Sequence, residues 1–299
     1  MNNAHHPPSN SWQRPFVTIW IGQAISLIGS SLVQFALIWW LTEKTQSATA
    51  LATASLVVFL PNAFLAPFAG VVVDRYSRRI LMIASDTLVA IATLSLAILF
   101  MVERAEIFHV YVALFIRSVA GNFQFPAMRA STSLMVPESH LSKIAGYNQI
   151  LHNSLRIITP PLGAILLNLL PLQSILMIDV FTALLGIIPL FFIFVPQPPK
   201  TNEQQSSFSM LKDLRSGAQY IISMPGFVYV IGIMCILNFL LDPAFSLTPI
   251  LVQNHFGGGA MQFAWVQSAA SLGGLASGFI FSIWVVRRKV LTSMLGVAV

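Results

Sequence analysis

Residues 70–79 read Gly70-Val-Val-Val-Asp74-Arg75-Tyr76-Ser77-Arg78-Arg79 and include the end of one apolar segment, 51–73, and the connection to the next, 80–102. Each segment is long enough to cross the hydrocarbon core of a bilayer, about 30 Å, as a helix. Arginines between two such segments are typical of a cytoplasmic loop. The stretch therefore predicts two membrane-spanning helices joined by a basic loop.

The composition extends this prediction to the whole chain. Hydrophobic residues make up 56% of the sequence and charged residues only 9%, whereas a soluble domain carries roughly a quarter charged residues. The net charge of +6 lies in short clusters between apolar segments, which suits loops at an anionic membrane surface and not nucleic-acid binding. The one cysteine, Cys235, excludes an intrachain disulfide.

Repeated apolar segments predict an all-α membrane protein, because backbone groups that face lipid must be hydrogen-bonded within a helix. We expect about eight full transmembrane helices and the start of a ninth at residue 291. The eight segments are 16–41, 51–73, 80–102, 107–127, 144–170, 175–195, 227–251 and 263–286.

The basic residues predict the orientation of these helices. With the N-terminus inside, twelve of the sixteen Lys and Arg residues lie on the inner side, Lys44 and Arg104 lie outside, and Arg117 and Arg156 lie within the membrane. Such a bias obeys the positive-inside rule. The sequence thus predicts a multi-pass protein of the plasma (inner) membrane with a cytoplasmic N-terminus.

A proline-containing polar stretch divides the chain. We expect a cytoplasmic tail over 1–15, a six-helix bundle over 16–195, a linker with an amphipathic helix over 196–226, and a partial second bundle over 227–299. Residues 16–22 resemble 227–232, and 78–81 resemble 288–291, at a separation of about 210 positions. These echoes suggest a parallel repeat of a six-helix unit, with the second copy cut short.

The pattern Gly-x-x-x-Asp-Arg-x-x-Arg-Arg between the second and third helices resembles the signature loop of the major facilitator superfamily. Ser77 stands where that family prefers glycine. The resemblance implies the major facilitator fold and a latch on the cytoplasmic gate, made partly against a late helix that this chain lacks. Gly70 is expected to let the helix end pack closely. The gating residues implied are Gly70, Asp74, Arg75, Arg78 and Arg79.

A closer resemblance is to the drug:proton antiporter branch of that superfamily, which includes macrolide efflux proteins. It rests on residues 18–28, 41–45, 115–118, 125–127, 136–141, 145–147 and 178–180. The resemblance implies export of small amphipathic, macrolide-like molecules by proton antiport. A siderophore or other metabolite exporter or permease of the same fold remains an alternative, as does a truncated chain that does not transport.

Charged residues within the predicted membrane segments are the candidates for proton coupling. Burying charge at this depth is costly, so such residues commonly mark a functional pathway. Asp86 lies about 9 Å from the inner end of its helix at 1.5 Å per residue, within reach of Arg117. Asp179 lies about as far from the outer end of the sixth helix. Both acids, together with Arg117 and Arg156, could carry protons or form fixed ion pairs.

The fifth helix resembles the proline–glycine motif of antiporters at Pro160, Gly163 and Ala164, although Leu155 and Thr159 replace expected glycines. His152 could titrate near neutral pH or be a buried, hydrogen-bonded residue. Other polar residues are candidates either for substrate contact in the cavity or for interhelical hydrogen bonds. They are Gln23, Gln34, Asn153 and Asn238.

No motif predicts an enzyme. The sequence has no ATP-cradling Gly-x-x-x-x-Gly-Lys-Ser/Thr loop, no His-Glu-x-x-His metal motif and no Gly-x-Ser-x-Gly nucleophile elbow. A membrane-embedded enzyme is therefore disfavoured, and we expect no metal and no cofactor beyond a proton gradient. The expected partners are an amphipathic small molecule, protons and the lipid bilayer. We expect no nucleic acid and a monomeric protein.

Overall fold

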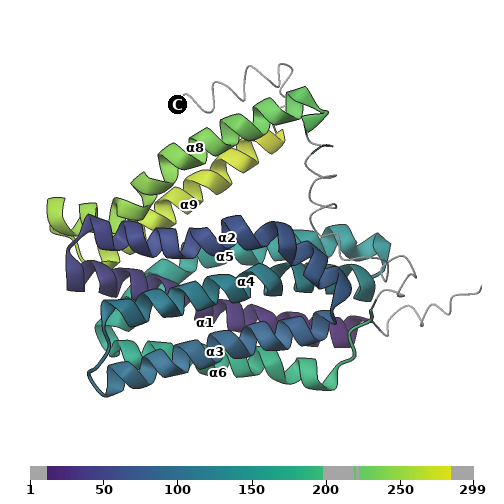
Figure 1. Ribbon diagram of the computed structural model, residues 1–299, viewed down its shortest axis with the longest axis horizontal. Coiled ribbons are helices and arrows are strands. Elements are labelled where there is room, and N and C mark those ends of the chain that lie inside the picture. The colour runs from purple at the N-terminus through teal and green to yellow at the C-terminus, as the bar shows by residue number, and fades with distance from the viewer. Residues whose placement is uncertain (1–11, 198–218, 220–221, 284–299) are drawn as a thin grey trace, which may run out of the picture.

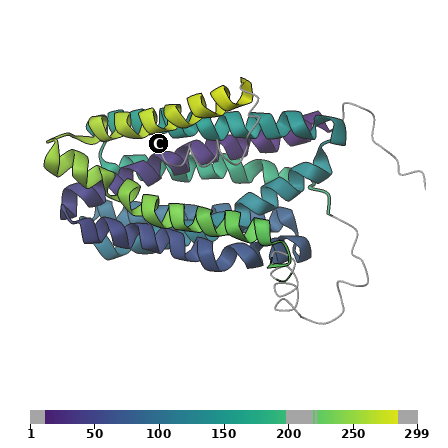
Figure 2. The same cartoon turned by 90° about the horizontal axis from the view of Figure 1, so that it is seen from above.

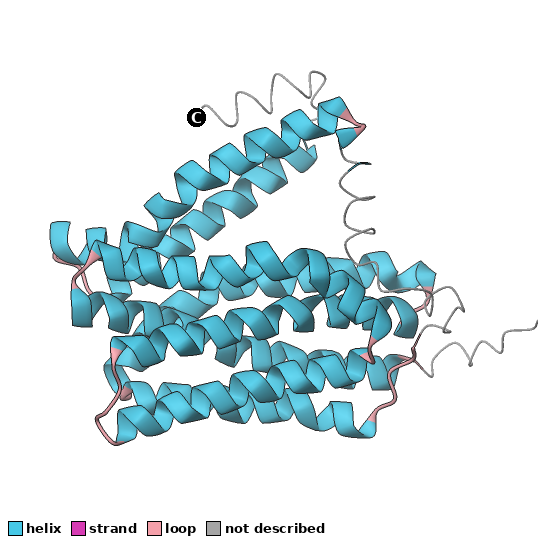
Figure 3. Cartoon of the chain, viewed as in Figure 1, coloured by secondary structure: helices cyan, strands magenta, loops and turns pink. Residues whose placement is uncertain are grey.

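The computed structural model describes residues 12–197, 219 and 222–283, and every regular element within those residues is helical (Figure 1 and Figure 3). The first part contains α1 (Gln13–Thr45), α2 (Ala48–Arg75), α3 (Arg78–Met101), α4 (Ile107–Met135), α5 (Glu138–Leu169) and α6 (Leu172–Phe192). The second contains α8 (Pro225–Ile250), the π-helical turn η2 (Leu251–His255) and α9 (Ala260–Ile283). The predicted fold class, a six-helix bundle followed by part of a second bundle, is confirmed.

The helices of the first bundle run back and forth, so their short connections lie at two ends. We call the end with residues 70–79, the start of α1 and the finish of α6 the Asp74 end. The other, which contains the connection between α3 and α4, is the Glu106 end. There Glu106 caps α4, and its backbone N–H donates to His109 Nδ1 at 3.1 Å. Such reciprocal caps satisfy backbone groups that the first helical turn leaves unpaired.

Six of the described helices are long and apolar enough to cross a membrane: α1, α2, α3, α5, α6 and residues Val228–His255. Helix α4 falls outside this set although it has 29 residues. Its polar side chains include Arg117, Asn122 and Gln124 in the middle of the helix. A helix that lines a polar cavity within a bundle can carry such residues, because they do not face lipid.

Several helices extend beyond the ends of the apolar segments predicted from the sequence. Helix α4 continues to Met135, and α5 already begins at Glu138, so only two residues connect them. The apolar pattern marks the part of a helix that faces hydrocarbon, whereas polar turns can extend the same helix beyond it. The amphipathic helix predicted around residue 214 and the ninth segment from residue 291 lie outside the described residues.

The second-half helices pack on the first bundle at the Glu106 end and tilt away from it toward the Asp74 end (Figure 1), and α9 runs beside α5 (Figure 2). Phe263 of α9 is buried and stacks on Phe35 and Trp39 of α1, with ring centroids 5.5 and 5.8 Å apart. Farther along α9, the Ser268 hydroxyl donates to the Ile157 carbonyl of α5 at 2.7 Å. The two halves are therefore joined mainly at one end.

Candidate functional site

A cavity of about 1390 Å³ lies between the first bundle and the second-half helices. Its wall is formed mainly by residues of α1, α4 and α5, with five residues from α9 and one or two each from α2, α3, α6 and α8. Near the Glu106 end the lining residues Phe35, Leu114 and Phe263 are buried. At the Asp74 end the lining residues Ser133 and Ala145 are exposed. The cavity is thus closed at the Glu106 end and open at the Asp74 end.

Arg117 and Asp179 form a buried ion pair beside the cavity. Asp179 of α6 is 0% exposed, and Arg117 Nη2 also donates to the Ser30 carbonyl of α1 at 2.9 Å. The Ser30 hydroxyl donates to Asp179 Oδ1 at 3.0 Å, and the Thr93 hydroxyl of α3 donates to Oδ2 at 3.2 Å. The ion pair thus joins α1, α3, α4 and α6. Its additional hydrogen bonds help to offset the free-energy cost of removing two charges from water.

Close approach of α1 and α6 makes this arrangement possible. A Cβ at Gly29 of α1 would overlap the Thr182 hydroxyl and lie 3.1 Å from the Asp179 Cα atom. Small residues at such crossings let two membrane helices approach backbone to backbone. Gly29 therefore brings the neighbouring Ser30 within hydrogen-bonding distance of Asp179.

Asp86 of α3 is buried in a different setting, 4% exposed and held by two glutamines. Gln23 Nε2 of α1 donates to Asp86 Oδ2 at 2.8 Å and to the Gly186 carbonyl of α6 at 3.2 Å. Gln124 Nε2 of α4 donates to Asp86 Oδ1 and, at 2.8 Å, to Gln23 Oε1. Within the part of the chain that the structure describes, no arginine or lysine is paired with Asp86.

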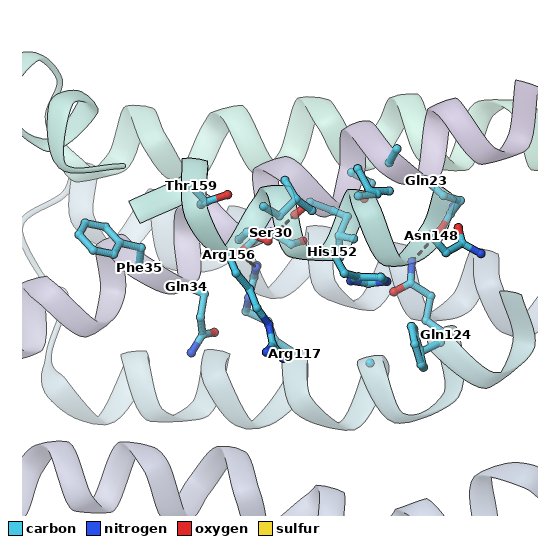
Figure 4. A pocket seen from close by; sticks show the side chains of 18 of the residues that line it. Gln23, Ser30, Gln34, Phe35, Arg117, Gln124, Asn148, His152, Arg156 and Thr159 are labelled. Atoms are coloured by element: carbon cyan, nitrogen blue, oxygen red, sulfur yellow. Dashed lines mark hydrogen bonds between the residues drawn. The ribbon is translucent and has the colours of Figure 1, made fainter. Parts of the chain in front are cut away.

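Arg117 thus forms its ion pair with Asp179, one of the two acids that the sequence left open as proton carriers or ion-pair partners. Arg117 donates to Asp179, 62 positions later in the chain, and Asp86 is bound by amides. The sequence is compatible with either acid as the partner of Arg117. In the structure α6 packs against both α1 and α3, and Asp179 lies beside Ser30 and Thr93, which Arg117 also contacts. Figure 4 shows Arg117, Ser30 and Gln23 along the cavity wall.

The arginines of the 70–79 loop bind the rest of their own bundle. Arg78 Nη1 donates to the Ala130 carbonyl of α4 at 2.9 Å, and Arg79 donates to the Leu190 and Phe191 carbonyls at the C-terminal end of α6. Such side chains satisfy carbonyls that a helix end leaves unpaired. Asp74 is exposed and lies 3.9 Å from Arg78. Arg75 is the last residue of α2 and lies at the same end of the bundle.

The close packing expected at Gly70 is not observed, since no described atom lies within 4 Å of the position a Cβ would take there. Gly163 of α5 does show it, because a Cβ would come within 2.7 Å of the Phe35 ring. Pro160 and Ala164 are buried on the same helix. The α5 motif thus sits where α5 meets α1.

The polar candidates separate into two groups. Gln23 and Gln34 line the cavity, as do His152 and Arg156 (Figure 4). Asn153 and Asn238 are not among the described lining residues; Asn238 is exposed on α8 and donates to the Met234 carbonyl of its own helix at 2.8 Å. Polarity and helical spacing could not tell a residue that faces the cavity, such as His152, from its neighbour in the chain, Asn153.

Sequence reasoning missed several members of these clusters, above all Gln124, Ser30 and Thr93. Gln124 carried a usable signal, because a glutamine inside an apolar segment needs a partner. Ser30 and Thr93 carried none, since hydroxyls in membrane helices usually bond to a carbonyl of their own helix.

Comparison with known proteins agrees with this architecture. The family model described as Major Facilitator Superfamily matches residues 19–299. Macrolide efflux protein A of Streptococcus pyogenes is 33% identical over 277 residues, which cover 92% of this chain and 68% of that protein. Macrolide efflux protein A of Enterococcus faecalis is 29% identical over 232 residues, 77% of this chain and 71% of that protein.

A solved structure shares the fold. It is the crystal structure of a bacterial homolog of the human lysosomal transporter Spinster, in an inward-facing and unoccupied conformation. The TM-score is 0.69 at 11% sequence identity, and the match covers 93% of this chain. The chain spans 64% of the length of that structure.

Proposed function

The chain belongs to the Major Facilitator Superfamily, whose members are transporters and not enzymes, and we propose that it exports small amphipathic molecules across the plasma membrane in exchange for protons. The proposal places the N-terminus in the cytoplasm, as the positive-inside rule favours. The protein would act as a monomer in the bilayer, with the proton gradient as its only energy source.

The cavity is the observation that carries this proposal. It lies between the two halves, is open at the Asp74 end and is closed at the other by the stacked rings of Phe35 and Phe263. In alternating access one half rocks against the other around such a central site. With the proposed orientation, the open end faces the cytoplasm, and the aromatic contact is the barrier that must part for release outside.

Asp86 is our candidate for the proton carrier. Protonating Asp179 would break its ion pair with Arg117, whereas protonating Asp86 breaks none. Both Asp86 oxygens now accept hydrogen bonds from glutamine amides. A protonated carboxyl must donate one, so one amide would have to turn its oxygen toward the acid.

Rotation of an amide would link proton uptake at Asp86 to the packing of the helices. Gln23 bonds at once to Asp86, to Gln124 of α4 and to the Gly186 carbonyl of α6. Turning either amide changes the hydrogen bonds that hold α1, α4 and α6 around the cavity. Proton uptake would thereby bias the bundle between two arrangements, which is what coupling requires.

The names of the relatives supply the first substrate to test. Two proteins called Macrolide efflux protein A align with most of this chain, so we propose macrolide-like drugs as substrates. We expect cells that express the protein to accumulate less radiolabelled erythromycin than cells with an empty vector. A protonophore should erase the difference, because it removes the proton gradient.

Arg117→Ala tests the site within the same assay. The change removes the cation that binds α1, α3 and α6, so export should be lost while the protein remains in the membrane fraction. Arg104→Ala, in the connection at the Glu106 end, is the matched control and should export normally. Normal export by Arg117→Ala would overturn the role of the ion pair. Protonophore-resistant export would overturn proton exchange.

A further inference from the structure

The charges on the cavity wall are unbalanced. Among the described lining residues the basic side chains are Arg117, Arg129 and Arg156, whereas Asp86 is the one acidic side chain. Asp86 is covered by its two glutamines, and Asp179 neutralises Arg117. Two arginines therefore remain on the wall without a carboxylate.

Both of these arginines are exposed to the cavity. The guanidinium of Arg129 lies 4.4 Å from the centroid of the Phe125 ring, so it is positioned by an aromatic face. Within the described ranges, neither Arg129 nor Arg156 forms a side-chain hydrogen bond or an ion pair. Each guanidinium keeps its planar set of donors free for an oxyanion.

Phe125 and His152 connect the two arginines across the gap between α4 and α5. The Phe125 ring meets the His152 ring edge-on, with centroids 5.6 Å apart. His152 precedes Arg156 by one helical turn, so both side chains lie on the same face of α5. Figure 4 shows His152 and Arg156 extending from α5 toward the cavity. The result is a cationic and aromatic strip, defined here as Phe125, Arg129, His152 and Arg156.

The end of the cavity nearer the Glu106 connection is apolar. It is lined by Phe35, Ile38, Val58, Phe245, Phe263 and Val266. A molecule that fills the cavity would meet cations and a ring edge toward the Asp74 end and hydrocarbon toward the Glu106 end. A ligand pocket that is mostly apolar, with a few convergent polar groups, orients its ligand in this way.

We infer that this cavity selects amphipathic anions, with a carboxylate or another oxyanion held by Arg129 and Arg156 and the apolar part held by the aromatic end. The inference rests on the proposed transport function and names the charge of its substrate. Guanidinium–oxyanion hydrogen bonds are charge-assisted and can be bidentate. A cationic amphiphile of the same shape would instead meet like charge and bind more weakly. Erythromycin carries an amine that is protonated at neutral pH, so the inference predicts that the cavity accepts it as a weaker ligand than an amphipathic anion of similar size.

The inference can be tested by binding, apart from transport. The purified full chain in nanodiscs of zwitterionic phosphatidylcholine is titrated with two fluorescent probes of equal length. One is a dansyl-labelled C12 carboxylate, and the other is the corresponding C12 trimethylammonium. Empty nanodiscs correct for partition into lipid. We expect the carboxylate to bind at least tenfold more tightly, and raised salt to narrow the difference.

Two variants then locate the selectivity. Arg129→Gln and Arg156→Gln should each weaken carboxylate binding about tenfold and leave trimethylammonium binding unchanged or tighter. Arg104→Gln, outside this cavity, should change neither. Equal or tighter binding of the ammonium probe, an equal loss for both probes, or no binding of either probe would overturn the inference. Carboxylate selectivity without protonophore-sensitive export in cells would support the inference and overturn the proposed function.

Discussion

The two buried acids of the first bundle differ in what surrounds them. Asp179 is fully buried, paired with Arg117 and hydrogen-bonded by two hydroxyls, so α1, α3, α4 and α6 are tied together through it. Asp86 lies on α3, and among the described residues its hydrogen-bond donors are the amides of Gln23 and Gln124. Both clusters lie in one bundle and draw on the same four helices.

The difference assigns the two acids different roles. A buried ion pair is strongly destabilised when one partner is lost, because the other charge is left uncompensated. An acid bound by neutral amides can take up a proton without leaving a partner cation unpaired. Asp179 is therefore suited to hold the bundle together, and Asp86 to respond to the proton gradient.

Removing the charge of Asp179 should have the largest effect on stability. Asp179→Asn leaves Arg117 buried without a carboxylate, and we expect the free energy of unfolding to fall by about 3 kcal/mol. Unfolding of the purified protein in mixed micelles, titrated with SDS, measures this change. The double variant Arg117→Leu/Asp179→Leu should recover most of the loss, since no charge remains buried. An Asp179→Asn protein that unfolds like the parent would contradict a structural ion pair.

Gly29, which lies beside this cluster, should have the second-largest effect on stability. Gly29→Ala places a methyl group against Thr182 and the Asp179 backbone, so α1 and α6 must separate. We expect a loss of about 2 kcal/mol in the same SDS titration, as for overpacking of a tight core. Gly121→Ala on α4 is the control, because no described atom lies near the added methyl group. Equal stability of the two variants would show that the close approach does not support the ion pair.

Asp86→Asn should separate stability from coupling. Asparagine resembles a protonated carboxyl that cannot ionise, so we expect a loss of only about 1 kcal/mol, the typical value of one hydrogen bond. Export should no longer respond to a protonophore or to an imposed pH gradient. Asp242→Asn on the exposed face of α8 is the control and should keep the response. If Asp86→Asn also keeps it, another group carries the proton.

The smallest effect is expected at Thr93. Thr93→Val removes the hydroxyl that accepts from Arg117 and donates to Asp179, while the ion pair itself remains. We expect a loss of about 0.6 kcal/mol, the average for interhelical hydrogen bonds in membranes. Ser31→Ala is the control, because that hydroxyl donates to the Leu27 carbonyl of its own helix and bonds to no other described helix. A larger loss for Ser31→Ala than for Thr93→Val would contradict the bridging role.

Much of the fold could be predicted because its signals are local. Apolar segments with polar connections indicated the helices, and a reading of the 70–79 stretch located the connection between α2 and α3. Arg117 was recognisable as a cation that needs a partner in the membrane. The partner itself could not be chosen from the sequence, because Asp86 and Asp179 lie about equally far from the nearer ends of their helices and both remained candidates.

The candidate site was predicted only in part for the same reason. Gln23, Gln34 and Arg156 line the cavity as their polarity suggested, whereas Asn153 and Asn238 do not line its described wall. Polarity within an apolar segment indicates that a residue needs a polar environment. It does not indicate whether that environment is the cavity, another helix or the carbonyl of the preceding turn.

The sequence by itself determined that this chain forms successive membrane helices, where most of them begin and end, and which few residues are too polar to face lipid. These properties follow from chain length, hydropathy and backbone hydrogen bonding, all of which act within one helix. Tertiary structure alone decided that Arg117 pairs with Asp179 and that Asp86 accepts hydrogen bonds from Gln23 and Gln124. Helix packing sets those pairings, and at Gly29 a missing side chain lets α1 and α6 come close enough to make them.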